Sequence, residues 1–521
     1  MLIAYPWLRV RNGTVLNIKL RGKISDQVKS RFSSGLSLPQ LCENFVKAAY
    51  DPRVSGVYLH IETLKCGWGK IEEIRRHILD FRKSDLWRKF VVGYALEWHE
   101  KEYYLGCVCD ELYAPPSAYF SMYGLTSRAM FLGGVFEKIG VEPQVQRIGK
   151  YKSAGDQLFR KNISEENREV LTTLLDNIYG NWVDKVSQAK GKSKEEIDSF
   201  INEGVYQIDK LKEDGWITDI KYDDEVYNYM NKKHARLPIL GVDHNSSSIF
   251  ETIFCIYHLN VKPFQVRSML KTRLDIVEKK KLPLIDYKKY SKIRKWSVGL
   301  SGGKDRIAVI RASGSISRVG GSSFSPSSGI IAEKFIKKIS KVRGYQTAPK
   351  AVIIRIDSPG GDLLASDLPD EEKLFAERAQ NFYKQFRDKA ACSRSMSVDT
   401  MEEVAQGRVW TGKDAASRGL VDAIGGFSRA VAIAKHKANI PHNKKVTLVE
   451  VSKPSFSLQK ILFGMLSSAI GIDTALKLLQ DNSATCDGVQ ARMDGIMFHG
   501  SEGSSFADPN FSLLKDCLTS L

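Results

Sequence analysis

The sequence predicts an α/β protein that contains two copies of one domain in tandem. Short apolar runs typical of strands alternate with amphipathic helical stretches along most of the chain, which predicts a largely parallel sheet covered by helices. The chain also repeats itself: G-V-Y-L-H-I-E-T at Gly56 matches A-V-I-I-R-I-D-S at Ala351, and N-I-Y-G-N-W-V-D-K at Asn177 matches N-F-Y-K-Q-F-R-D-K at Asn381. An apolar content of 43% and a charged content of 26% are ordinary for a globular protein.

The first copy alternates strands and helices as far as Gln188. Alternating polarity predicts strands, and apolar residues three or four positions apart predict helices. The expected strands are Val15–Arg21, Gly56–Ile61, Phe90–Leu96 and Asp110–Tyr113. The expected helices are Ser37–Tyr50, Gly69–Phe81, Tyr103–Cys109 and Asn162–Gln188.

The second copy begins at Asp305 with the expected strand Ile307–Ala312. A loop rich in glycine and serine follows over Ser313–Ser328, but it lacks the G-x-G-x-x-G pattern of a nucleotide-binding loop. The helix Ile330–Val342 and the strand Ala351–Ser358 come next, and this strand runs directly into P-G-G-D. We therefore expect the same order of elements as in the first copy.

The second copy is shorter than the first inside the repeat. Equivalent positions are 295 residues apart at Val57 but only 204 residues apart at Asn177, so 91 residues are missing between these two points. The break lies near Leu368–Pro369. We expect the second domain to be truncated internally at this place.

The missing stretch corresponds to strands and helices of the first copy and to its loop Arg147–Asp156. A layered fold that loses part of its sheet keeps an open edge. We therefore expect Val352, Ile354 and Ile356 to lack partners, and the second half of the chain to be poorly folded.

Four regions follow from these patterns. Between the two copies lie an irregular insertion, His234–Phe264, and a basic linker, Lys279–Lys295. The expected regions are a complete first domain over 13–232, the insertion and linker over 233–304, a truncated second domain over 305–440, and a C-terminal extension over 441–521.

The formal net charge of +18 is compatible with nucleic acid or an anionic membrane as partner. Lysine and arginine are spread along the whole chain without a nucleic-acid-binding signature, so we expect no nucleic-acid partner. The eight cysteines show no C-x-x-C, and the nine histidines show no H-E-x-x-H. We therefore expect no disulfide framework, no metal and no cofactor.

No apolar run reaches the roughly 18 residues that a membrane-spanning helix needs. The most apolar runs, Ile249–Leu259 and Ile461–Ile472, are interpreted as core helices or as helices that lie on a surface. The chain opens with M-L-I-A-Y-P-W-L-R-V, which indicates neither a signal peptide nor a transit peptide.

Several motifs resemble one known family. They are Y-K-S-A-G-D at Tyr151, R-I-D-S-P-G-G-D at Arg355, F-R-D-K-A-A at Phe386, S-R-S-M-S-V-D at Ser393 and Q-G-R-V-W-T-G at Gln406. Together they resemble the signal peptide peptidase A family, also called protease IV, of the S49 serine peptidases. The tail G-V-Q-A-R-M-D-G-I-M-F at Gly488 is most similar to the chloroplast members of plants.

The resemblance implies two tandem domains of the ClpP/crotonase type that assemble as a homotetramer. It implies cleavage of peptides by a serine–lysine dyad, with residual signal peptides and membrane-associated or damaged proteins as substrates. It also implies a location in the chloroplast, peripheral to the thylakoid membrane.

The resemblance implies a role for four residues. Lys152 matches the general base, since a serine hydroxyl needs a base to become nucleophilic. Ser153 follows it directly and is a candidate to hold it in place. Gly360 and Gly361 match part of the oxyanion hole, where backbone N–H groups meet a substrate carbonyl. Without the family, Lys152 is an ordinary loop lysine and the two glycines form a simple turn.

The nucleophile is missing from the expected place. In the family it lies in an A-S-G-G-Y-Y stretch, which belongs to the absent residues. The first copy has H-E-K-E-Y-Y at His99–Tyr104 instead, and Ser366 matches a different family position, S-D-L after the glycine turn. Two interpretations remain open: a peptidase with a shortened chain, or a non-catalytic pseudopeptidase that binds or regulates complete subunits. The patterns do not favour another crotonase-type acyl-transfer enzyme.

Overall fold

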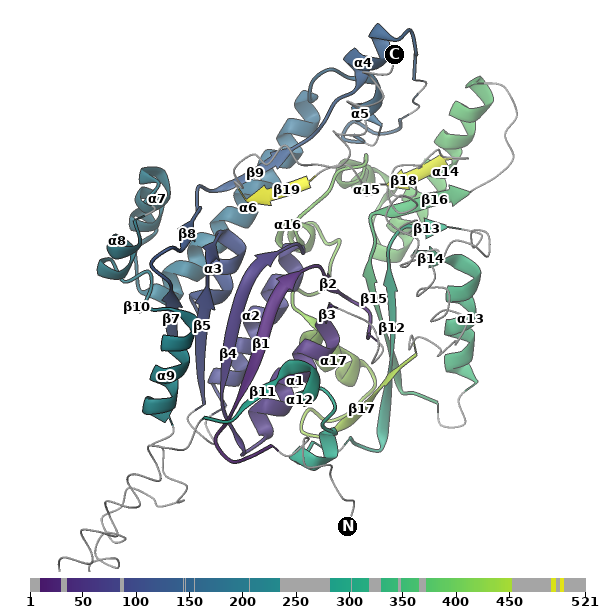
Figure 1. The fold of residues 1–521 in the computed structure, drawn as a ribbon. Helices are drawn as coiled ribbons and strands as arrows, with labels where there is room; N and C mark the ends of the chain where they lie inside the picture. The colour runs from purple at the N-terminus through teal and green to yellow at the C-terminus, as the bar shows by residue number, and fades with distance from the viewer. Residues whose placement is uncertain are drawn as a thin grey trace, which may run out of the picture.

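The computed structural model contains two α/β bodies side by side, the first in purple to teal and the second in green (Figure 1). The residues that it describes are 10–29, 35–84, 89–143, 145, 147–153, 155–205, 207–234, 282–300, 302–317, 329–344, 348–364, 372–451, 489–492 and 497–500.

The first body is organised around a parallel sheet with the strand order β10-β7-β5-β4-β1-β11. In register, Leu16 lies beside Val57, and Val57 lies beside Val91. In chain order the strands are β1 (Thr14–Gly22), β4 (Val54–Leu64), β5 (Phe90–Ala95), β7 (Glu111–Ala114), β10 (Asp219–Ile220) and β11 (Leu284–Asp286).

Helices bury both faces of this sheet. On one face α1 (Leu38–Tyr50), α2 (Trp68–Arg82) and α3 (Glu100–Gly106) share the main apolar cluster with strand residues such as Val57. On the other face α9 (Asp223–His234) packs against a second apolar cluster that includes Tyr58. The fully buried isoleucines of α2 contribute about 2 kcal/mol each at most. These strands and helices confirm the expected α/β class.

The second body has a smaller parallel sheet with the order β15-β12-β17. Its strands are β12 (Asp305–Ser313), β15 (Ala351–Asp357) and β17 (Val446–Glu450). The helix α13 (Ala332–Arg343) covers β12 on one face, where Ala308, Ile310 and Val342 form a small apolar cluster. On the other side α17 (Phe427–Lys437) contacts β15.

The internal repeat is visible element by element. The strands β12, β15 and β17 correspond to β1, β4 and β11, and α13 corresponds to α1. The later helices also correspond: α6 (Glu165–Lys190), α7 (Lys194–Glu203) and α8 (Ile208–Glu213) match α14 (Glu372–Arg394), α15 (Val398–Val404) and α16 (Gly412–Ser417). Equivalent serines, Ser193 and Ser397, cap α7 and α15.

The described part of the second body is smaller than the first body. Among the described residues, the second body has no counterpart of α2, β5, α3 or β7. The exposed fractions of Val352, Ile354 and Ile356 on β15 are 46%, 44% and 67%, whereas the equivalent Val57, Leu59 and Ile61 are buried.

Two domain boundaries differ from the prediction. Residues expected in the linker form β11, which pairs with β1, and α12 (Tyr287–Tyr290), which packs on the first body. The buried ammonium of Lys47 donates hydrogen bonds to the carbonyl oxygens of Tyr290, Ser291 and Ile293 and so fixes this segment. Likewise β17, expected in the C-terminal extension, closes the second sheet.

The remaining elements are short. The strands are β2 (Ile24–Ser25), β3 (Leu36–Ser37), β6 (Glu97–Trp98), β8 (Tyr119–Phe120), β9 (Leu125–Arg128), β13 (Ile316–Ser317), β14 (Ile330–Ile331), β16 (Gly360–Leu364), β18 (Val489–Arg492) and β19 (Met497–Gly500). The helices are α4 (Gly133–Lys138), α5 (Asp156–Phe159) and the 3-10 helix η2 (Lys295–Val298). Elements β9, α4 and α5 belong to an arm above the first sheet (Figure 1).

Some predictions lie outside the described residues. These are the insertion beyond His234, the runs Ile249–Leu259 and Ile461–Ile472, and Ser366. Within the part of the chain that the structure describes, no helix has the length and apolarity needed to cross a bilayer.

Candidate active site

An ion pair and two glycines determine the shape of the loop that carries Lys152. Gly149 and Gly155 have φ angles of +98° and +94°, which favour glycine. The guanidinium of Arg147 lies 3.1 Å from the carboxylate of Asp156, whose side chain is buried. Burial raises the pKa of Asp156, although Arg147 and Arg160 oppose this effect. The loop therefore has a defined shape rather than that of a solvated tail.

A turn of the second body holds this loop from outside. The Tyr151 N–H donates a hydrogen bond of 3.0 Å to the carbonyl oxygen of Gln406. Both Gln406 and Gly407 have left-handed backbone, with φ of +51° and +76°. A Cβ atom on Gly407 would lie 2.9 Å from Cα of Lys152, so only glycine fits between the two chains. The position of Lys152 thus depends on both halves of the chain.

Side chains of α14 and α15 support the turn from behind. The Tyr383 hydroxyl donates to a carboxylate oxygen of Glu402 at 2.8 Å and accepts from the N–H of Gln406 at 3.2 Å. The guanidinium of Arg387 lies 3.0 Å from the same carboxylate. The strained residue Gln406 is therefore held by hydrogen bonds, as is typical of backbone strain near functional sites.

Aromatic and charged side chains join the two bodies at the same place. Arg408 stacks over the rings of Tyr151 and Trp410, and its guanidinium lies 2.8 Å from the carboxylate of Glu169 on α6. Asn177 of α6 donates a hydrogen bond of 3.0 Å to Asp414. These contacts fix the loop of the first body against the second.

A cavity of about 370 Å³ lies between the two bodies. Its wall is largely apolar on the side of α6. It is lined by Tyr151, Ser153, Asn167, Val170, Leu171, Leu174, Ser358, Pro359, Gly407 and Val409. Lys152 is the neighbour of two lining residues, and Gly360 follows another, Pro359. The structure thus brings the Y-K-S-A-G-D and S-P-G-G motifs to one cavity.

The S-P-G-G turn is tightly built at the end of β15. Gly360 has a φ of +107°, and a Cβ atom on Gly361 would lie 2.0 Å from the carbonyl oxygen of Ile316. The Gly360 N–H donates to Oγ of Ser358 at 3.1 Å. The turn therefore needs glycine at both positions, and an oxyanion would have to compete with Ser358 for the Gly360 N–H.

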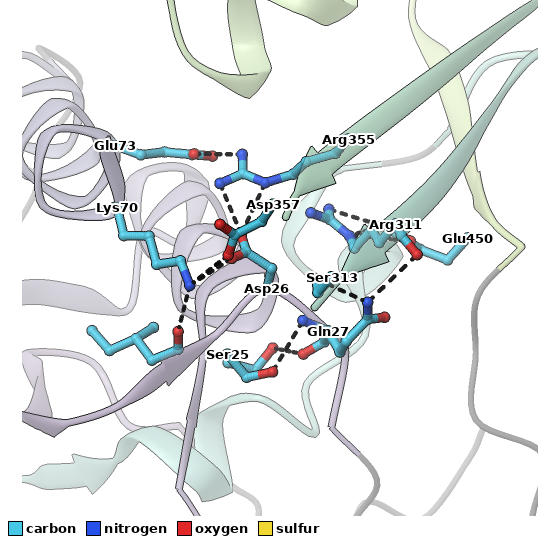
Figure 2. Close-up of polar contacts among 12 residues, drawn as sticks. Ser25, Asp26, Gln27, Lys70, Glu73, Arg311, Ser313, Arg355, Asp357 and Glu450 are labelled. Atoms are coloured by element: carbon cyan, nitrogen blue, oxygen red, sulfur yellow. Dashed lines mark hydrogen bonds and ion pairs between the residues drawn. The ribbon is translucent and has the colours of Figure 1, made fainter. Parts of the chain in front are cut away.

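An ionic cluster anchors the strand that leads into this turn. Figure 2 shows Arg355 reaching from β15 to Asp26 and to Glu73 of α2. Its nitrogens lie 2.8 Å from a carboxylate oxygen of each. Lys70 of α2 joins Asp26 and Asp357 at 2.6 Å and 3.0 Å. The cluster ties β15 to the first body through Arg355 and Asp357, which stand three residues and one residue before Ser358.

Two carboxyl groups of this cluster, Asp26 and Asp357, have opposite pKa shifts. Burial alone would raise the pKa of Asp26, but hydrogen bonds from Asp357 and Lys70 and the charge of Arg355 hold it below its usual value. The hydrogen bond with Asp26, together with burial, raises the pKa of Asp357. Asp357 is therefore the carboxyl of the pair that takes up a proton first.

The H-E-K-E-Y-Y stretch of the first body places a buried glutamate at the start of α3. His99 precedes α3, and Glu100 is the first residue of this helix and is buried. One carboxylate oxygen of Glu100 accepts hydrogen bonds of 3.0 Å from the N–H groups of Tyr123 and Gly124. Burial raises the pKa of Glu100 to about 7. This position can hold a structural turn but offers no hydroxyl nucleophile.

Both halves of the chain match one family model. The model of peptidase family S49 matches residues 88–237 and 362–441. The serine protease SPPA, chloroplastic, of Arabidopsis thaliana is 53% identical over 608 residues, which cover all of this chain and 83% of that protein. The chain belongs to peptidase family S49. Protease 4 of Haemophilus influenzae is 22% identical over 462 residues, and the match covers 75% of this chain and 72% of that protein.

The alignment also agrees with a shortened S49 chain. Its 608 positions exceed the 521 residues of the chain by 87. The match in two segments fits the tandem arrangement of domains. Membership of S49 makes the chain a serine peptidase by family.

Solved structures of low identity were also matched. ClpP1 from Listeria monocytogenes is 12% identical, with a TM-score of 0.22 over 40% of this chain and 93% of its own. A putative enoyl-CoA hydratase from Magnetospirillum magneticum is 15% identical, with a TM-score of 0.21 over 47% of this chain and 81% of its own.

The contacts that join the halves could not be predicted from the motifs. Gln406 and Gly407 lie in a motif that carried the resemblance, but nothing in the sequence links them to Lys152. The sequence shows Lys70 only as a residue near the start of a predicted helix, and this position alone does not indicate a role in the site. Arg355 and Asp357 stand in the R-I-D-S-P-G-G-D motif, which could have suggested a role for their charges.

Proposed function

We propose that the gene for this chain encodes a serine endopeptidase of the signal peptide peptidase A type that works through a serine–lysine dyad. The observation that carries the proposal is the cavity between the Lys152 loop and the Ser358 turn. In this proposal Lys152 takes the proton of a serine hydroxyl, and Ser153 supports the lysine. The backbone at Gly360 and Gly361 stabilises the oxyanion that forms on the substrate carbonyl.

The 521-residue chain itself is proposed to be inactive. The repeat lacks 91 residues in the second half, where the family carries its nucleophile. The excess of 87 alignment positions supports a deficit of this size. A base and an oxyanion turn without a nucleophile cannot form an acyl-enzyme.

Restoring the missing segment tests the dyad. A chain rebuilt with the A-S-G-G-Y-Y segment of a complete transcript should cleave peptides, and Lys152→Ala should lower kcat at least a thousandfold. The matched control is Lys150→Ala, since Lys150 lies in the same loop over the ring of Tyr151 and should be dispensable. Cleavage by the Lys152 variant within a few-fold of its parent would show that another group is the base.

A second candidate function is a non-catalytic subunit that binds or regulates complete ones. The exposed face of β15 favours it, because a truncated domain with a bare apolar surface is suited to binding. Sequencing the transcripts of the gene separates the two functions. Transcripts that always omit the A-S-G-G-Y-Y segment would exclude the peptidase.

The resemblance to the chloroplast protease also supports a proposed setting. We place the protein in the chloroplast, as a homotetramer peripheral to the thylakoid membrane. Its proposed substrates are residual signal peptides and membrane-associated proteins. The net charge of +18 supports electrostatic attachment to anionic lipid. Salt should therefore extract the protein from membranes, and extraction by detergent alone would contradict peripheral attachment.

A further inference from the structure

The second body exposes apolar side chains from two neighbouring elements. Val352 and Ile354 of β15 lie in register beside Ala308 and Ile310 of β12, the residues that α13 covers, so they are on the same face of the sheet as α13. Val352, Ile354 and Ile356 are nevertheless exposed, and Ile336 of α13 is 61% exposed. We call these four residues the β15 patch. Large apolar side chains that gather on one surface indicate an interaction site more often than single ones do.

The first body shows what covers this surface in a complete domain. Val57, Leu59 and Ile61 of β4 occupy the positions of the three β15 residues, and Cys42 of α1 occupies that of Ile336. All four are buried in the first body. There α2 packs against α1 and shares their apolar cluster. The β15 patch is therefore the surface that a helix equivalent to α2 would cover in a complete second domain.

The sequence of α2 indicates which kind of helix can bind to such a surface. Its buried apolar side chains are Ile71, Ile74, Ile78 and Phe81, each at most 1% exposed. They are separated by three, four and three positions, which places them on one side of a helix. An occupant needs about three turns of amphipathic helix with apolar residues at this spacing.

The charge beside the patch indicates the polar side of the occupant. The sequence of α13 contains Lys334, Lys337, Lys338 and Lys341 against one acidic residue, Glu333. A helix that docks along α13 is favoured when acidic side chains flank its apolar stripe. An acidic amphipathic helix thus matches both the apolar residues and the charge.

We propose that the β15 patch binds an acidic amphipathic helix of another polypeptide, in the place that α2 occupies in the first body. The binding mode is that of a helix in a groove, with the apolar stripe against β15 and acidic residues towards α13. This function requires no catalytic serine and is independent of the peptidase activity proposed above.

The test uses the full chain and a labelled peptide with the sequence of Gly67–Lys83. A second peptide carries Arg76→Glu and Arg82→Glu. Fluorescence anisotropy should show saturable binding of both peptides, with the acidic peptide at least threefold tighter. Ile354→Glu in the chain should weaken binding at least tenfold. The matched control is Ile424→Glu, because Ile424 is 60% exposed outside the patch and should leave binding unchanged.

Ile336→Glu, at an exposed helix position, is a second variant in case the strand substitution disturbs β15. Circular dichroism verifies that each variant is folded. Three outcomes would overturn the proposal: absence of saturable binding, binding by both patch variants as tight as that of the parent chain, or no gain in affinity from the acidic peptide. If the chain forms dimers that Ile354→Glu dissociates, the occupant is a second copy, and the proposal is also wrong.

Discussion

At the scale of single residues, Gly407 determines whether the Lys152 loop can pack against the second body. The φ of Gly407 is +76°, and the backbone of Lys152 lies where its Cβ atom would be placed. Left-handed backbone costs other residues about 1–2 kcal/mol, and the overlap adds to this. A side chain at this position must therefore displace the loop.

Gly407→Ala should release the loop of Lys152. We expect trypsin to cleave after Lys150 or Lys152 at least threefold faster than in the parent chain, as measured by mass spectrometry. The control is Gly180→Ala, since Gly180 lies in α6 with no atom within 4 Å of its added Cβ. Equal cleavage rates in all three chains would show that the turn does not hold the loop.

At the scale of elements, α3 begins with Glu100, a buried carboxyl whose charged form lowers the stability of the folded chain. Because burial raises the pKa of Glu100 to about 7, the folded chain keeps a proton that the unfolded chain releases near pH 4.5. The contribution of protonated Glu100 to the free energy of unfolding is therefore fully present below pH 4.5, and it is lost as the pH rises through about 7. A shift of this size corresponds to about 3 kcal/mol.

Glu100→Gln should remove this part of the pH dependence, since the amide oxygen still accepts hydrogen bonds from Tyr123 and Gly124. Urea unfolding of the first body, followed by tryptophan fluorescence, should show a smaller loss of stability between pH 5 and pH 8 than in the parent. The exposed Glu213→Gln serves as control. A parent and a Glu100 variant with the same pH dependence would refute the assignment.

The elements predicted correctly are those with strong local periodicity. The isoleucines of α2 and the apolar run of β4 determine helix and strand without reference to distant residues. The strands β11 and β17 were not predicted, because they are short and gain their pairing from β1 and β12, far away in sequence. For the same reason, the motif at Gln406 was visible in sequence, but its contact with Tyr151 was not.

At the scale of the whole molecule, the two halves differ in how much apolar surface they bury. The first sheet is covered on both faces, whereas the described core of the second centres on Ala308, Ile310 and Val342. Hydrophobic burial is the main source of stability, so the second half should open more easily.

Limited proteolysis should reveal this difference. Residues 13–225 should persist at least threefold longer than residues 305–430 when fragments are followed by mass spectrometry. The contacts of Arg355 and Arg408 with the first body protect part of the second half, so cleavage should begin away from them. A second half as resistant as the first would contradict a loss of core by truncation.

The central claim is that the chain has the base and the oxyanion turn of an S49 peptidase but lacks its nucleophile. A fluorophosphonate probe tests this directly, because it reacts with activated serines. We expect no labelling of the 521-residue chain. In a chain with the missing segment restored, we expect labelling of one serine, and this labelling should depend on Lys152. Stoichiometric labelling of any serine in the 521-residue chain would contradict it.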